Sequence, residues 1–150
     1  MQWDEIMNWI KKLFGKSDEQ QNLQSVADEI NSNMDKIRQA GSVDGHHYTD
    51  SVEKVKQLKR EGKNHDAINI LLEAVNSTEK EAEFAGEGWG VAPWYYEQLA
   101  IIYRKEKKYQ KEVEILERYS AQPKAPGVGP QKLAERLVKA KEMLAKQNNV

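Results

Sequence analysis

The apolar residues of this sequence recur at helical spacing along nearly its whole length, and this pattern constrains the fold more than any other feature. Within seven stretches they lie three or four positions apart, as along the buried face of an amphipathic helix. No stretch of four or more residues alternates apolar and polar side chains with the β-branched residues that strands favour. The sequence therefore predicts an all-α protein, with helices over residues 2–14, 18–40, 50–60, 64–83, 94–106, 109–120 and 131–146.

Glycine, proline and capping residues predict where these helices end. Gly15 lacks a Cβ and is expected to stop the first helix. The run Ser17-Asp18-Glu19-Gln20 is typical of a capping box that starts the second helix. Three glycines between residues 86 and 90 are expected to break the chain again, and Pro93 fits the first turn of the next helix. The remaining expected connections are a loop over 41–47 and an extended linker over 123–130.

Length and composition restrict the class of protein. A chain of 150 residues suggests one domain, which buries roughly two-thirds of its surface on folding. Because the sequence has no cysteine, disulfides, cysteine-ligated zinc and thiol catalysis are excluded. No apolar run approaches the ~20 residues of a membrane span, and the first residues lack the basic and apolar regions of a secretory signal. We therefore expect a cytoplasmic protein.

The formal net charge of −1 conceals an asymmetry along the chain. Residues 1–103 carry 11 basic and 18 acidic side chains, whereas residues 104–150 carry 12 basic and 6 acidic ones. A chain with this charge separation can pair end to end with a second copy, or present a basic surface to an acidic partner.

Residues 48–120 resemble the tetratricopeptide repeat, a helical hairpin that stacks into a superhelix. A turn glycine, Gly62, precedes by five residues an alanine, Ala67, that lets two helices approach closely, and Ala74 follows seven residues later. Further matches to the family's first and second helices are Tyr96, Leu99, Ala100, Tyr103, Tyr109 and Leu116. The resemblance implies about two antiparallel hairpins stacked as a short superhelix, with the helix over 131–146 as a C-terminal cap.

The sequence departs from this family at one contact position and in the number of repeats. In the second unit Glu112 occupies the position equivalent to Ala67, 45 residues later, although the family's period is 34. Because glutamate is not small, we expect the second hairpin to pack with altered geometry. Two repeats are fewer than the three that such arrays usually need, so other segments or a partner must cover the exposed faces. We expect N-terminal amphipathic helices over 1–41 and a helical-repeat domain over 48–150.

The resemblance also implies a binding groove along the first helix of each hairpin. The corresponding positions here are Thr49, Val52, Lys56, Lys59, Arg60, Trp94, Glu97, Ile101, Arg104 and Lys105. Five are cationic and one is anionic, so we expect the groove to bind an acidic segment or a free C-terminal carboxylate. We also expect Trp89 to contact the partner, because an aromatic side chain between glycines can close over a ligand. The expected partner-binding residues are Lys56, Lys59, Arg60, Trp89, Trp94, Glu97, Arg104 and Lys105.

No motif in the sequence predicts catalysis, a cofactor or a metal site. His46 and His47 are adjacent, so they cannot easily bind one ion, and the sequence has no histidine pair at helical spacing. The glycine-rich segment 86–90 lacks the lysine and hydroxyl residue of a phosphate-binding loop. We therefore expect a non-enzymatic protein-binding module without cofactor or metal. A hydrolase or transferase with unrecognised residues is a weaker hypothesis.

Two further surfaces leave alternatives open. Five cations lie within residues 104–111, so the basic C-terminal third supports nucleic-acid binding as the alternative function. A thin apolar seam at nearly heptad spacing, Leu23, Val26, Ile30, Met34 and Ile37, makes a homo-oligomer plausible. The stripe within 2–14 suits packing on the repeats, docking on a partner, or a membrane interface, but Asp4 and Glu5 weaken the membrane hypothesis.

Overall fold

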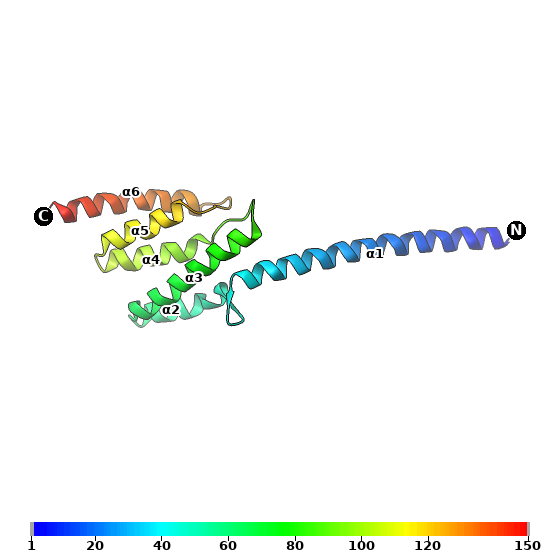
Figure 1. The fold of residues 1–150 in the computed structure, drawn as a ribbon, viewed down its shortest axis with the longest axis horizontal. Helices are drawn as coiled ribbons and strands as arrows, with labels where there is room; N and C mark the ends of the chain where they lie inside the picture. The colour runs from blue at the N-terminus through cyan, green and yellow to red at the C-terminus, as the bar shows by residue number, and fades with distance from the viewer. Residues whose placement is uncertain (1, 150) are drawn as a thin grey trace. The chain divides into compact units, whose positions relative to one another are not determined.

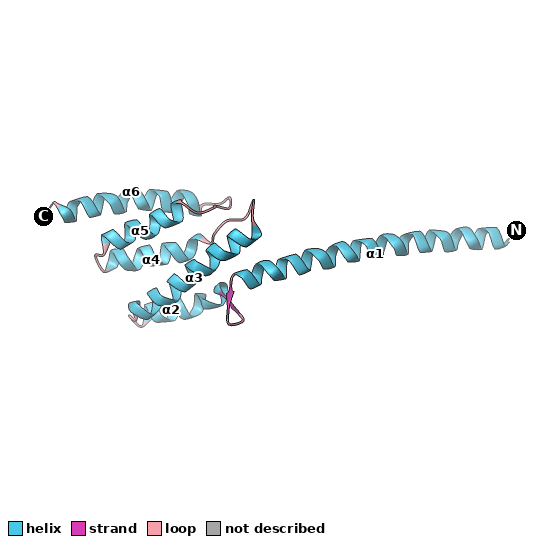
Figure 2. Cartoon of the chain, in the orientation of Figure 1, coloured by secondary structure: helices cyan, strands magenta, loops and turns pink. Residues whose placement is uncertain are grey.

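The computed structural model describes residues 2–149, without the side chains of residues 14–17. Within these residues the fold is all-α, as predicted, with six α-helices and one very short hairpin of strands (Figures 1 and 2). The elements are α1 (Gln2–Ala40), β1 (Ser42–Val43), β2 (His46–His47), the 3₁₀ helix η1 (Tyr48–Ser51), α2 (Val52–Arg60), α3 (Asn64–Ala85), α4 (Pro93–Lys105), α5 (Tyr109–Ser120) and α6 (Gly129–Asn148).

The N-terminal region forms one helix where the sequence predicts two. α1 runs for 39 residues without a break, so the expected stop at Gly15 and the expected start at Ser17 are both wrong. A glycine inside a helix costs only about 1 kcal/mol relative to alanine, and the nearby Lys16, Glu19 and Gln20 are good helix formers. The predicted apolar residue Phe14 and the capping side chain of Ser17 lie outside the described side chains.

The expected loop over 41–47 is a tight β-hairpin. Ser42 pairs with His47 and Val43 with His46 in antiparallel register. Between the strands, Asp44 and Gly45 both have positive φ, 51° and 80°, which is the backbone of the two-residue turns that match strand twist. The Asp-Gly dipeptide is the sequence signal for this turn.

The chain divides into two compact units, Met1–Lys36 and Ile37–Val150. In the first unit the large apolar side chains of α1 are exposed, from Trp3, with 75% of its surface accessible, to Met34 with 47%. The exposed set also contains Ile6, Met7, Trp9, Leu13, Leu23, Val26 and Ile30.

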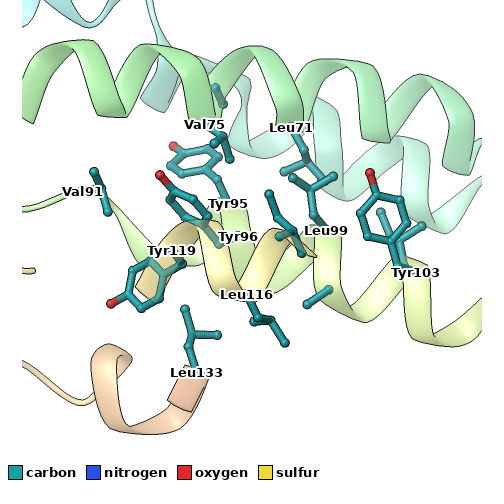
Figure 3. Close-up of a cluster of buried hydrophobic side chains, with 14 of the residues drawn as sticks. Leu71, Val75, Val91, Tyr95, Tyr96, Leu99, Tyr103, Leu116, Tyr119 and Leu133 are labelled. Atoms are coloured by element: carbon teal, nitrogen blue, oxygen red, sulfur yellow. The ribbon is translucent and has the colours of Figure 1, made fainter. Parts of the chain in front are cut away.

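The second unit is a stack of helices around one core. α2 and α3 form one hairpin, α4 and α5 form another, and α6 packs on α4 and α5 (Figure 1). Tyrosines and aliphatic side chains from α2, α3, α4, α5 and α6 form this core, part of which Figure 3 shows. The labelled members are Leu71, Val75, Val91, Tyr95, Tyr96, Leu99, Tyr103, Leu116, Tyr119 and Leu133.

Several small residues are buried where the helices pack. Ala67, Ala100 and Ala140 are fully buried, and Ala74 is 3% exposed. Gly62, with φ of 72°, makes the turn between α2 and α3. α6 begins at Gly129, so the linker predicted over 123–130 ends two residues earlier than expected.

Two long connections pack on each other at one end of the core. The Val91 amide donates to the Pro123 carbonyl at 3.0 Å, and the Ala92 amide donates to Thr78 Oγ1 of α3 at 2.9 Å. Among residues 2–149, no helix has the length and apolar character needed to cross a membrane.

Candidate functional site

A buried carboxylate lies at the junction of α4, α5 and α6. Glu112 has no accessible surface, and the Arg104 guanidinium contacts both of its oxygens, at 2.6 Å from Nη2 to Oε1 and 3.0 Å from Nε to Oε2. A second guanidinium, that of Arg136 on α6, approaches Oε1 at 3.5 Å. Burial and the charge of Arg104 lower the pKa of Arg136, and the charges of Glu112 and Glu97 oppose this effect. Two cations around one carboxylate leave this junction with excess positive charge.

This cluster explains how the chain accommodates glutamate where the repeat pattern has a small residue. The two arginines supply the countercharge that a buried carboxylate needs, so the helices pack around an ion cluster. Arg104 also donates to the Arg136 carbonyl at 3.4 Å, which ties α4 to α6. Glu97 on α4 pairs with Lys132 on α6 at 2.7 Å. Two of the expected binding residues, Glu97 and Arg104, therefore make contacts between helices.

Three of the expected binding residues form a basic surface on α2 and α4. The Lys59 ammonium on α2 donates to the side-chain carbonyl of Gln98 on α4, and this hydrogen bond links the two helices. Desolvation is the main cause that lowers the pKa of Lys59; the nearby charge of Lys105 lowers it further, and the charge of Glu97 opposes both. Arg60 and Lys105 are exposed. We call Lys59, Arg60, Gln98 and Lys105 the basic patch; within residues 2–149, none of its three cations has a salt-bridge partner.

The remaining expected residues lie near this surface or in the core. Lys56 is exposed and makes a weak i,i+3 pair with Glu53 at 3.5 Å. Trp94 is half-buried at the start of α4 and packs edge-on against Tyr95, with ring centroids 5.1 Å apart. Trp89 is half-buried against the core from the 86–92 connection. Across the described chain, no hydrogen bond or ion pair joins either tryptophan's ring to the basic patch.

Sequence reasoning missed a second polar cluster between the β-hairpin and α3. His47 Nδ1 accepts from the Thr49 amide at 3.3 Å and lies 2.8 Å from Thr49 Oγ1, and Nε2 contacts the buried Glu81 carboxylate. Tyr48 donates to the other oxygen of Glu81 at 2.9 Å, and burial raises the pKa of Tyr48 to about 12. A Cβ on Gly41 would collide with this carboxylate. Because both ring nitrogens are occupied, His47 has the geometry of a structural residue.

The surface also has shallow hollows. One, of about 160 Å³, lies beside the β-hairpin and is lined by residues that include His46, Tyr48 and Glu73. A broader one of about 530 Å³ is lined by Tyr109, Lys139, Met143, Lys146 and Gln147. Within residues 2–149 no three His, Asp or Glu side chains are grouped closely enough to hold a metal ion.

Comparison with known proteins found no matching protein-family model, no matching curated protein and no matching solved structure. The resemblance to the tetratricopeptide repeat therefore stays a prediction.

Proposed function

We propose that this protein is a non-enzymatic helical-repeat module that binds an acidic protein segment on the basic patch. One observation carries the proposal: within residues 2–149 neither Lys59 nor Lys105 forms a salt bridge, and Lys105 lies close enough to Lys59 for its charge to lower the pKa of Lys59, an effect that the charge of Glu97 opposes. Like charges held together are destabilising, and an anionic ligand would relieve this repulsion.

The neighbouring groups support an extended acidic ligand over a single small anion. Arg60 follows Lys59 on α2, and its planar guanidinium can hold a carboxylate through two parallel hydrogen bonds. Gln98 already accepts a hydrogen bond from Lys59, so its amide NH₂ group is available as a neutral donor beside the cations. The cations come from two helices that the Lys59–Gln98 hydrogen bond links, and successive carboxylates of one extended peptide can meet them in turn.

A fluorescein-labelled ten-residue polyglutamate peptide tests the proposal by fluorescence anisotropy. We expect the full chain to bind it with an affinity that falls as salt is added, because the contacts are between exposed charges. The variant with both Lys59→Glu and Lys105→Glu should bind at least about tenfold more weakly, since two attractive contacts become repulsive. Arg104 is not used in this test, because reversing its charge would also break the cluster around Glu112.

The matched control reverses two lysines elsewhere, Lys80→Glu and Lys141→Glu. Both side chains are exposed, on α3 and α6, and this variant has the same net charge as the test variant. It should keep most of the affinity. Equal losses in the two variants, or no binding of polyglutamate by the original chain, would contradict the proposal. Far-ultraviolet circular dichroism checks that both variants keep their helices.

The hollow lined by Tyr109, Lys139 and Lys146 favours a second candidate, binding of single-stranded nucleic acid. An aromatic side chain among lysines provides stacking and charge together. Salt-sensitive binding of a labelled oligothymidylate that is lost on Lys139→Glu plus Lys146→Glu, without binding of polyglutamate, would support this alternative over the first.

A further inference from the structure

The part of α1 between residues 23 and 37 carries a narrow apolar stripe. Leu23, Val26, Ile30 and Met34 each expose about half of their surface or more, from 47% to 65%. Ile37, one turn before the helix ends, continues the stripe. At 3.6 residues per turn these five side chains fall within an arc of about 80°. A stripe this narrow fits a single facing helix rather than a flat surface.

The spacing of the stripe is symmetric about its centre. Starting from Leu23, the successive intervals are three, four, four and three residues, so the pattern is the same when it is followed in the opposite direction from Ile37. An identical antiparallel helix would therefore set Ile30 against Ile30, Val26 against Met34 and Leu23 against Ile37. A two-fold axis that passes beside Ile30 produces this arrangement, as closed homodimers require.

The charges beside the stripe also match an antiparallel copy. Glu29 and Lys36 are seven residues apart, so they lie on the same flank of the helix. In an antiparallel pair the same flanks of two helices face each other, and Glu29 of one copy meets Lys36 of the other twice. The two residues are offset by about 7.5 Å along the axis, which their long side chains can span. Within the described chain neither has a salt-bridge partner.

We propose that a second copy of this chain covers the stripe, and that the two α1 helices pair antiparallel about Ile30. The seam is shorter than the three to four heptads typical of a stable coiled coil. The dimer is therefore weak and dissociates on dilution.

Sedimentation velocity of the full chain over a series of concentrations tests this proposal. We expect a reversible monomer–dimer equilibrium. Ile30→Asp should raise the dissociation constant by about a hundredfold or more, because two buried isoleucines are replaced by two facing carboxylates. The matched control is Val138→Asp on α6, where the valine is 61% exposed, and it should leave the equilibrium unchanged. A chain that is monomeric at every concentration, or a dimer that Ile30→Asp leaves intact, overturns the proposal.

A charge exchange and a crosslink test the direction of pairing. Glu29→Lys alone should weaken the dimer about tenfold, and adding Lys36→Glu should restore it. Because the sequence has no cysteine, Val26→Cys and Met34→Cys give unique thiols. Under oxidation the mixture of these two variants should crosslink more than either alone. Dominant crosslinking of Val26→Cys to itself indicates a parallel pair and overturns the proposal. The proposal is also overturned if the chain stays monomeric and binds phosphatidylcholine vesicles, and if Ile30→Asp abolishes this binding.

Discussion

A carboxylate without access to water is costly unless cations surround it, and Glu112 meets this condition with two arginines. The arginine side chains remain partly accessible, with 26% of the surface of Arg104 and 21% of that of Arg136 exposed, although Nε of Arg136 is buried. Water therefore shares the solvation of the cations, while the carboxylate depends on them entirely. We therefore expect the junction between α4, α5 and α6 to be stable only while the buried carboxylate keeps its two arginine partners.

Removing the carboxylate should destabilise the fold. Glu112→Ala leaves a cavity and two facing guanidiniums without a counterion, so we expect the free energy of unfolding to fall by about 3 kcal/mol. Urea unfolding followed by circular dichroism measures it. Glu117→Ala on the same helix is the control, because its pair with Lys141 is half exposed and should contribute less than about 1 kcal/mol. Similar losses for the two variants would show that the cluster does not stabilise the fold.

At the residue scale the sequence shows that Glu112 is unusual, but it does not predict which cations pair with it. Glu112 stands out because it interrupts an apolar helix face at a position where the repeat pattern has a small residue. Its partner Arg136 lies on a helix 24 positions later, and no local signal distinguishes it from the exposed cations around it. Arg104 is predicted from the sequence to face a ligand, and its charge is used within the fold. The sequence gives the number of cationic side chains, whereas the packing of the helices decides which of them form ion pairs within the fold.

Helices and their connections are predicted more accurately than side-chain partners. α5 has the predicted bounds, and α4 and α6 begin within two residues of them, because apolar spacing and proline are local signals. The error at Gly15 has an equally local cause. Glycine is a weak helix breaker, and only the surrounding sequence decides whether its cost of about 1 kcal/mol ends the helix. The β-hairpin was missed although Asp44-Gly45 is a known turn signal, because two-residue strands have no detectable alternation.

The contact between the 86–92 and 121–128 connections depends on Gly90. A Cβ at this position would collide with the Ala125 amide and lie 2.6 Å from the Lys124 carbonyl carbon, and neither backbone atom can move alone. Gly90→Ala should therefore cost about 2 kcal/mol by forcing the connections apart. Its thermal midpoint should fall clearly below that of Glu87→Ala, an exposed substitution in the same connection. Equal thermal midpoints for the two variants would mean that the contact between the connections does not stabilise the fold.

At the scale of the second unit, the stack of hairpins follows from features that the sequence contains. Buried alanines at 67, 74 and 100 and tyrosines at helical spacing define which faces meet. The proposed binding surface is less predictable because it consists of the cations that packing does not use. Lys132 on α6 pairs with Glu97, whereas the cations of the basic patch form no salt bridge within residues 2–149.

The tyrosine-rich core makes the whole unit sensitive to alkali. Burial raises the pKa of Tyr48 and of Tyr95 to about 12, and burial also raises the pKa values of Tyr96, Tyr103 and Tyr119. The pKa of an unfolded tyrosine is about 10. Between about pH 10 and pH 12 the unfolded chain has therefore lost protons that the folded chain keeps, and the free energy of unfolding falls as the pH rises.

Replacing Tyr95 isolates one of these protons. Its hydroxyl makes only a long hydrogen bond, 3.4 Å to the Tyr48 carbonyl, so Tyr95→Phe should cost less than about 1 kcal/mol at neutral pH. Between pH 10 and pH 12 the slope of unfolding free energy against pH should be shallower in this variant by up to about 1.4 kcal/mol per pH unit. Urea unfolding at several pH values gives both slopes. Parallel slopes would mean that Tyr95 ionises alike in the folded and unfolded chains, and alkaline unfolding would then have to begin at the other buried tyrosines.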